Sequence, residues 1–192
     1  MLLFNEAQDL EAYWDLKYYE NYGTPEEELV HHEYEKNVIT NGGRSLTLYN
    51  LFALAGSSTA LYMCAGSGST AASNTDTHLT AELIAGTNRK LLVNNAGTQL
   101  VAGNVTLSTF DDTSVGSPGQ FYYVNIQVQA TYLGASDANV NQYFQEFGLV
   151  TALACPATPT GTSGVLFNHY VAASPIQLTT AITLVVTVTL RV

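Results

Sequence analysis

The stretch CAGSGSTAASNTDTHLTAEL, residues 64–83, contains residue types that carry out chemistry in many proteins. A glycine-rich loop is followed by a run of hydroxyls and then by Asp76, His78 and Glu82. A phosphate-binding P-loop needs a lysine directly after its last glycine, and this stretch contains no lysine. The strand and helix that flank a dinucleotide-binding glycine loop are also missing from the pattern. The loop therefore predicts no nucleotide site.

A metal site at the same stretch is also a weak interpretation. His78 and Glu82 are four positions apart and would share one face of a helix. One His and one Glu do not complete a zinc site, and His169 is the residue that could join them. The simpler interpretation is that Asp76 or Thr77 caps a short turn, while Glu82 points to solvent or anchors a backbone amide. We expect no metal and no cofactor.

Other catalytic constellations are equally weak. No Gly-x-Ser-x-Gly elbow occurs, so the many serines do not indicate a hydrolase. Asp111 and Asp112 lie in a turn-like loop, where Asx-turn hydrogen bonds are the main interpretation and a calcium site is the alternative. A glycosidase needs two placed carboxylates. Residues 37–192 hold only six acids: Asp76, Glu82, Asp111, Asp112, Asp137 and Glu146. We expect no enzymatic activity.

Glu146 is the most informative of these acids. The segment YFQEFGLV places its carboxylate among aromatic and aliphatic residues of an expected strand. An inward-facing carboxylate must be hydrogen-bonded, because an unpaired buried charge is very costly. We therefore expect Glu146 to be a structural latch across strands rather than a catalytic acid with a raised pKa.

The charge is distributed unevenly over the 192 residues. The formal net charge is −10, and charged residues make up only 11% of the chain. Residues 1–36 hold ten of the sixteen acids, whereas residues 37–192 are close to neutral. No cluster of Lys or Arg is present for a phosphate backbone, and the acidity opposes an anionic membrane. We expect no nucleic-acid partner and no membrane partner.

The ends and the cysteines add few constraints. The opening MLLFNEAQ lacks the basic region and long apolar region of a signal peptide, and no apolar run is long enough for a membrane helix. Cys64 and Cys155 lie far apart, and no Cys-x-x-Cys pair indicates a structural zinc. Two buried free thiols are the favoured interpretation, and a disulfide stays open.

Residues 1–36 predict an acidic helical arm. Asn5 is a fair N-cap, and Gly23 is a plausible stop. Thr24-Pro25 followed by acids is typical of a second helix start, running to about Lys36. An aromatic and aliphatic stripe follows helical spacing in the first helix. The candidate partner-contact residues are Leu10, Tyr13, Trp14 and Tyr18. The arm packs either on its own body or on a neighbour.

Residues 37–192 predict a β-sandwich body. Residues 48–55 fit one short helix, and the pattern then changes to β. Strict alternation over 121–133 and 181–192 is typical of strands with one buried face, and 61–66 is a short buried run. Weaker strands are expected near 89–94, 104–110, 144–153 and 165–172. Many short strands with Gly-, Ser- and Pro-rich turns favour a mainly β fold, an antiparallel sandwich of the jelly-roll type.

Several segments in this order resemble a group of tailed-bacteriophage virion structural proteins. They are NVITNGGRSLTLYNLFAL, LYMCAGSGSTAASNTDTHLTAEL, VNIQVQATYL, FQEFGLVTA and the C-terminal GVLFNHYVAASPIQLTTAITLVVTVTLRV. The Asp-Thr…Glu positions of the group fall on Asp76, Thr77 and Glu82. Its Glu-x-Gly-Leu positions fall on Glu146, Gly148 and Leu149. The resemblance covers residues 37–192.

The resemblance implies assembly rather than catalysis. The partners would be a major capsid protein or other virion proteins, with a homo-oligomer, a trimer by preference, located in a virion assembled in the host cytoplasm. Asn168-His169 departs from the group, where a basic residue is common, and puts one charge contact in doubt.

Four functions remain open at this stage, and an enzyme is the last of them. A capsid decoration or cement protein that stabilises the head shell is the favoured one. A neck, collar or tail-fibre adaptor protein is the alternative. A carbohydrate-binding module with exposed tyrosines such as Tyr122, Tyr123 or Tyr143 comes next.

Overall fold

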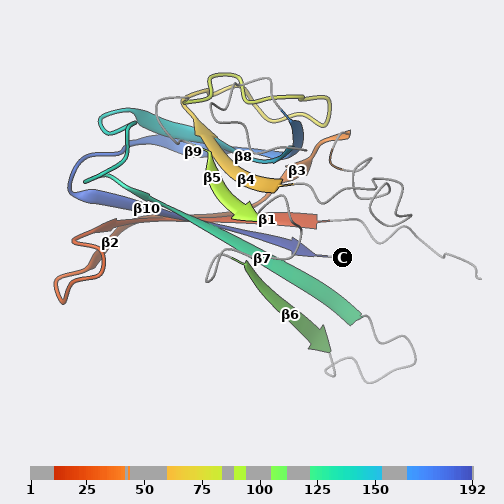
Figure 1. Cartoon of the computed structure of the whole chain (residues 1–192), viewed down its shortest axis with the longest axis horizontal. Helices are drawn as coiled ribbons and strands as arrows, with labels where there is room; N and C mark the ends of the chain where they lie inside the picture. Colours follow the sequence, from red (N-terminus) through yellow and green to blue (C-terminus); the bar gives the residue numbers. More distant parts are fainter. Residues whose placement is uncertain are drawn as a thin grey trace, which may run out of the picture.

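Two antiparallel β-sheets stack into a sandwich-like fold in the computed structural model (Figure 1). The structure describes residues 11–41, 43, 60–83, 89–93, 105–111, 122–152 and 164–191. The predicted helix at 48–55 and Cys155 lie outside these residues. The mainly β fold predicted from the alternating segments is confirmed.

The first sheet, sheet A, contains both ends of the described chain. Its strands follow the order β2-β1-β10-β7-β6. Their bounds are β1 Glu11–Glu20, β2 Glu28–Lys36, β6 Val105–Asp111, β7 Tyr122–Leu133 and β10 Ile182–Arg191. β10 pairs with β1 on one side and with β7 on the other. The last strand of the sequence therefore lies at the centre of this sheet.

The second sheet, sheet B, carries the candidate site. Its strands follow the order β3-β9-β8-β4-β5. Their bounds are β3 Val38–Ile39, β4 Ala60–Gly66, β5 Lys90–Val93, β8 Tyr143–Ala152 and β9 Val165–Gln177. β8 and β9 form a hairpin with two register shifts, and β4 pairs with the other side of β8.

The predicted helical arm is wrong for residues 11–36, which form β1 and β2 of sheet A. β1 pairs with β10 without interruption from Glu11↔Arg191 to Glu20↔Ile182. Its burial alternates strictly with period two, which is the signature of a strand. The buried side chains are Ala12, Trp14, Leu16 and Tyr18. Pairing with β10 and burial of this apolar face override the helical propensity of the segment.

The predicted second helix start at Thr24-Pro25 is instead the connection between β1 and β2. Asn21 and Gly23 have positive φ angles of 51° and 78°. The Thr24 amide donates to the Asn21 carbonyl at 3.1 Å, and the Glu27 amide donates to the Thr24 carbonyl at 3.2 Å. Tight turn geometry therefore replaces the expected helix, although the hydroxyl of Thr24 still accepts from the Glu26 amide.

The structure redistributes the four predicted partner-contact residues. Leu10 lies outside the described residues. Trp14 and Tyr18 are buried in the chain's own core, with exposed fractions of 0% and 2%. Tyr13 is half-buried on the opposite face of β1 and stacks on Tyr34 of β2, with ring centroids 5.9 Å apart.

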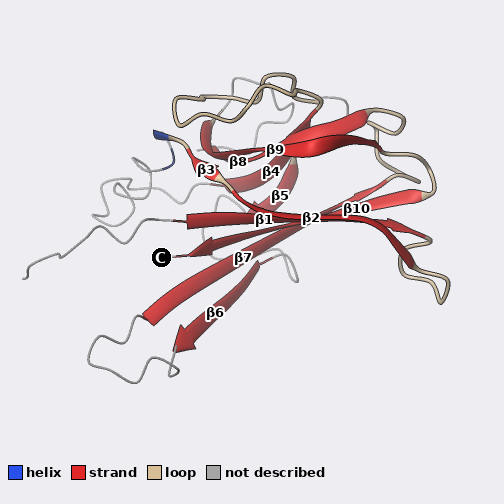
Figure 2. Ribbon diagram, turned by 180° about the vertical axis from the view of Figure 1, so that it is seen from behind, coloured by secondary structure: helices blue, strands red, loops and turns tan. Residues whose placement is uncertain are grey.

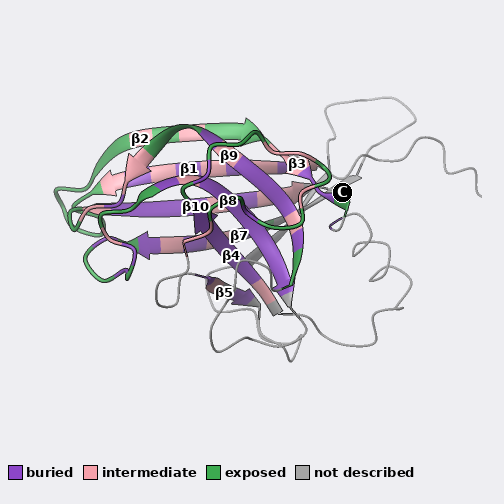
Figure 3. Cartoon of the chain, turned by 90° about the horizontal axis from the view of Figure 1, so that it is seen from above, coloured by how far each residue is buried: buried purple, intermediate pink, exposed green. Residues whose placement is uncertain are grey.

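An aromatic cluster joins the two sheets, and the strands of both sheets carry buried residues, drawn purple in Figure 3. Trp14 of β1 stacks on Tyr170 of β9 at 5.7 Å between centroids and contacts Phe147 of β8 at 5.9 Å. Val128, Ala130 and Tyr132 of β7 and Leu184, Val186 and Val188 of β10 complete the same core. The predicted alternation of β7 and β10 is confirmed at these positions. No helix among the described residues is long and apolar enough to cross a membrane.

Candidate functional site

A loop formed by residues 67–83, called the anchored loop below, covers the outer face of sheet B. It leaves the end of β4 and returns beside it, since the Ser67 amide donates to the Ala81 carbonyl and the Leu83 amide donates to the Ala65 carbonyl, both at 2.9 Å. The loop is yellow above β8 and β9 in Figure 1 and tan in the reverse view of Figure 2. Leu79 of the loop packs into a second small core with Cys64, Val150 and Leu166.

The carboxylate of Glu146 holds both ends of the anchored loop. Glu146 lies on β8 and has no exposed surface. Its Oε1 accepts from the amides of Gly68 at 3.1 Å and Ala81 at 2.5 Å, and its Oε2 accepts from the amide of Thr80 at 2.9 Å. Backbone amides that converge on one point in this way form an anion-binding concavity. The glycine-rich loop is thus a cradle for the chain's own carboxylate, which sits where an external anion would bind.

The glycines of the loop give this carboxylate its space. A Cβ atom added at Gly68 would lie 2.6 Å from Oε1 and 2.8 Å from Oε2 of Glu146. A Cβ atom at Gly66 would meet the same side chain and the Ala81 carbonyl. The backbone approaches the carboxylate too closely for any larger residue, which explains the Gly-x-Gly spacing.

His169 of β9 bridges two carboxylates. Its Nε2 lies 3.2 Å from Oε2 of Glu146, and its Nδ1 lies 2.6 Å from Oδ2 of Asp76. Asp76 belongs to the anchored loop and also accepts the Ser73 amide at 2.8 Å. A ring nitrogen that faces a carboxylate oxygen must carry a proton, so this geometry holds His169 as an imidazolium. We call Asp76, Glu146 and His169 the charge cluster.

The pKa shifts agree with that assignment. Burial by itself raises the pKa of Glu146, but the hydrogen bonds from His169 and from the three amides outweigh it and hold the pKa below 4.5. Burial by itself lowers the pKa of His169, but its bonds to Glu146 and Asp76 raise the pKa above 6.5. Both shifts favour the charged form of the group.

A second buried ion pair lies at the end of the anchored loop. Arg89 Nε contacts Glu82 Oε1 at 2.6 Å, and Arg89 Nη2 contacts Glu82 Oε2 at 2.9 Å. The exposed fractions of the two side chains are 2% and 3%. The expectation that Glu82 points to solvent or anchors a backbone amide is wrong, because Arg89 forms a bidentate pair with it. Burial opposes the charge of Arg89, and Glu82 outweighs that effect and raises its pKa.

The remaining candidates do not form a reactive group. His78 is exposed, and within the described part of the chain it bonds to its neighbour Thr77, at 2.9 Å between Nδ1 and Oγ1, so it stays outside the charge cluster. Cys64 is a free buried thiol that donates to the Gly148 carbonyl, and burial raises its pKa well above 9.0. Among the described residues no group of three or more His, Cys, Asp and Glu could hold a metal ion. Both ring nitrogens of His169 already face carboxylate oxygens.

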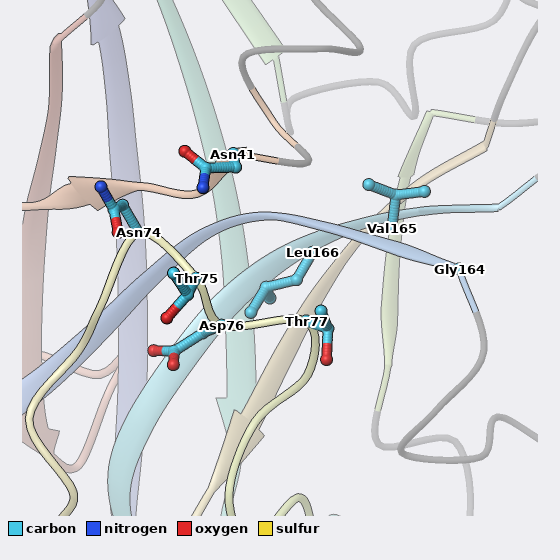
Figure 4. Close-up of a pocket in the computed structure, with 8 residues that line it drawn as sticks. All are labelled: Asn41, Asn74, Thr75, Asp76, Thr77, Gly164, Val165 and Leu166. Carbon is cyan, nitrogen blue, oxygen red and sulfur yellow. The ribbon is translucent and has the colours of Figure 1, made fainter.

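A pocket of about 400 Å³ lies beside the charge cluster (Figure 4). Thr75, Asp76 and Thr77 line it from the anchored loop, and Val165 and Leu166 line it from the start of β9. Oδ2 of Asp76 is already bonded to His169 and to the Ser73 amide. The pocket has room for a small molecule.

Two residues of this region were not assigned their roles by the sequence. The sequence indicates His169 as a metal ligand beside His78 and as part of the Asn168-His169 departure from the resembling group, and it indicates no role for Arg89. One pattern in the sequence could have predicted the Glu146–His169 contact. Each of two neighbouring apolar strands contains one ionisable residue, Glu146 in β8 and His169 in β9. Asp76 could not be joined to them, because it lies 93 positions from His169 and only the return of the loop brings them together.

The comparisons with known proteins identify no relative. No family model matches the chain, and neither a curated protein nor a solved structure is similar to it.

Proposed function

We propose that this chain is a bacteriophage virion structural protein, in the first place a capsid decoration or cement protein that stabilises the head shell. The proposal rests on the resemblance of residues 37–192 to that group. The structural observation that supports the proposal is the position of the resembling motifs at the anchored loop. Asp76, Glu82, Glu146 and Gly148 all lie under or in the anchored loop, and each has an internal structural partner or a packing role.

The departure at Asn168-His169 fits the same proposal. His169 supplies a positive charge between Asp76 and Glu146, as a basic residue would at that place. Asn168 is buried and its Oδ1 accepts the Leu149 amide at 2.9 Å. The charged residues of these motifs bind one another and hold the anchored loop to sheet B. This internal use supports a rigid scaffold rather than a catalyst.

The finer fold assignment, a jelly roll, is part of the proposal. Strand pairs nest from outside to inside as β1 with β10, β3 with β9 and β4 with β8, around the β6–β7 hairpin. Nested pairing of this kind supports a rolled-up hairpin. The pairs β3–β9 and β4–β8 lie in the same sheet, which departs from the alternation of pairs between sheets in a regular jelly roll.

The outer face of β7 and β10 in sheet A is suited to repeated, neutral contacts. On this face Gln127 donates to Thr189 at 3.2 Å and Gln129 donates to Thr187 at 3.1 Å, so amides and hydroxyls form a ladder across β7 and β10. Such a surface carries little charge. A homo-oligomer, by preference a trimer, would bind at symmetry positions of a shell assembled in the host cytoplasm, where many copies multiply a small contact.

The copy number of the chain per purified virion tests this function. Quantitative mass spectrometry against the major capsid protein is expected to count hundreds of copies. A count near a dozen would favour the alternative, a neck, collar or tail-fibre adaptor. Absence of the chain from the virion would overturn the structural assignment altogether.

A further inference from the structure

β2 is an edge strand with a defined set of outward-facing backbone groups. It pairs with β1, and no described strand lies on its other side. The Asn37 amide donates to the Ala12 carbonyl at 2.8 Å, which fixes the phase of the β1–β2 ladder. In an antiparallel ladder hydrogen-bonded pairs alternate with non-bonded pairs, so His32 and Tyr34 direct their N–H and C=O groups away from β1. These groups are available to an added strand.

Exposed apolar side chains concentrate on the same hairpin. Seven large hydrophobic residues of the described chain are exposed, and four of them lie on β2 or on the turn before it. They are Tyr22, Leu29, Val30 and Tyr34, with exposed fractions of 42%, 48%, 43% and 59%. β2 is the green strand at the margin of the molecule in Figure 3. A contact surface with apolar anchors is therefore present on an otherwise polar molecule.

Among the residues whose exposure the structure describes, the hairpin also carries most of the exposed negative charge. Residues 20–36 contain six glutamates and one lysine. Glu33 is occupied, because it accepts from the Tyr170 hydroxyl at 2.9 Å and from the Ala173 amide at 3.1 Å. Glu27 accepts from the Gly23 amide within the turn. The other four, Glu20, Glu26, Glu28 and Glu35, are exposed and form no ion pair with any described residue.

This charge argues against a second copy of the chain as the occupant. Pairing β2 with β2 of another copy would place glutamates close to glutamates, and like charges across a strand pair are destabilising. The same charge favours a segment rich in Lys or Arg. A groove of about 390 Å³ lies at the end of β2, lined among others by Glu35, Lys36 and Ala173, and gives such a segment room to continue past the strand.

We propose that β2 binds a basic, extended segment of a partner protein as an added strand of sheet A. The main-chain groups of His32 and Tyr34 would hold the strand, Leu29, Val30 and Tyr34 would anchor its apolar residues, and Glu28 and Glu35 would select its positive charge. This inference deepens the proposed assembly function by naming the chemistry of the partner, and it rests on that function.

Binding of a model strand to the isolated chain tests the inference. The probe is a fluorescein-labelled peptide, acetyl-KTKVKTKVK-amide, whose alternation suits a strand, and the matched control peptide has Glu in place of every Lys. We expect the basic peptide to bind, the acidic one not to bind, and amide hydrogen exchange of His32 and Tyr34 to slow in the complex. Rising salt should weaken binding, because the selecting charges are exposed.

Three variants separate the contributions. Tyr34→Pro removes an outward N–H without breaking a bond to β1 and should weaken binding by about tenfold or more, whereas Tyr34→Ala keeps that N–H and should bind more tightly than the proline variant. Glu28→Gln/Glu35→Gln should weaken binding and reduce its salt dependence. The matched control Glu20→Gln/Glu26→Gln removes the same charge outside β2 and should change affinity by less than about threefold.

Defined results would overturn the inference. Equal binding by the Tyr34→Pro and Tyr34→Ala proteins would show attraction by charge without an added strand. Equal losses in the two glutamine variants would show that net charge alone acts. Protection of amides elsewhere, or no binding at low salt, would also reject it. None of these results bears on the copy number in the virion, so failure of this inference and failure of the proposed function are distinguishable.

Discussion

The Glu146 carboxylate is fully buried, and its lost hydration is replaced by three backbone amides and the imidazolium of His169. Removing one partner from such a buried ion pair costs far more free energy than the intact pair contributes to stability. The reason is that the remaining charge stays buried without compensation. The same site also has a steric requirement, because a Cβ atom at Gly68 would lie too close to the Glu146 carboxylate.

A double-mutant cycle between Gly68 and Glu146 tests that steric claim. Glu146→Ala should lower the free energy of unfolding by about 3–5 kcal/mol, because the buried His169 charge then keeps only one carboxylate partner, Asp76. Gly68→Ala alone should cost about 1–3 kcal/mol through overpacking. In the Glu146→Ala background the same glycine change should cost little, because the three nearest atoms to the new Cβ all belong to Glu146. Urea denaturation measures each value, and additive costs would contradict the contact.

Two buried tyrosines allow a matched comparison of satisfied and unsatisfied hydroxyls. The Tyr18 hydroxyl is buried with no hydrogen-bond partner among the described residues, whereas the Tyr170 hydroxyl donates to Glu33 at 2.9 Å. Tyr18→Phe should leave the free energy of unfolding unchanged or raise it by up to about 1 kcal/mol. Tyr170→Phe should lower it by about 1.5–3 kcal/mol, because the acceptor is a carboxylate. Thermal or urea denaturation of the two variants decides, and a larger loss for Tyr18→Phe would reverse the assignment.

At the scale of the element, the anchored loop depends on two charges that titrate in opposite directions. The pKa of His169 is raised, so its contribution to stability is complete below 6.5 and is lost as the pH rises through the folded-state pKa. The pKa of Glu146 is lowered, so its contribution is complete above 4.5 and is lost as the pH falls through the folded-state pKa. The loop should be held most firmly between these two values.

Hydrogen exchange over residues 67–83 measures this dependence. After correction for the intrinsic pH dependence of exchange, protection of the Gly68, Thr80 and Ala81 amides should be greatest from about pH 4.5 to 6.5 and should decline on both sides. His169→Gln should lower the protection and remove the decline on the alkaline side. A wild-type profile without any alkaline decline would contradict the imidazolium assignment.

The strand β1 shows why an element can be misassigned from its sequence. Its residues Ala12, Trp14, Leu16 and Tyr18 alternate with polar ones, which is a strand pattern, but Tyr13, Trp14 and Tyr18 also fit a helical stripe. Glu, Leu, Ala and Lys favour a helix in isolation. Pairing with β10 favours the strand over the helix, because the apolar face of β10 at Leu184, Val186 and Val188 continues that of β1.

At the scale of the whole molecule, residues 11–36 are part of sheet A rather than an appendage to it. Deleting residues 1–36 would expose the edge of β10 along its whole length and remove Trp14, Leu16 and Tyr18 from the core. We expect the truncated chain to show no cooperative thermal transition, because loss of one buried aromatic alone costs about 3–5 kcal/mol, a large part of a typical total stability. Circular dichroism melting of both chains measures this. A truncated chain that melts cooperatively near the wild-type temperature would contradict it.

The sequence by itself determined the properties that depend on near neighbours in the chain. Period-two alternation over β7 and β10 predicted their buried faces, because side-chain direction in a strand is a local property. A carboxylate in the apolar segment around Glu146 indicated a buried group in need of hydrogen-bond partners, and the structure buries it on the outer face of sheet B under the anchored loop. The absence of a lysine in the glycine loop argued against a phosphate site.

Only the tertiary structure decided the properties that depend on distant residues. It paired β1 with β10 and so made a strand of a segment with helical propensity. It brought Asp76 and His169 together across 93 positions and gave the glycine loop an internal anion. The physical reason is that the free energy of a buried charge or of a sheet edge is set by what packs against it, and the local pattern does not contain that information.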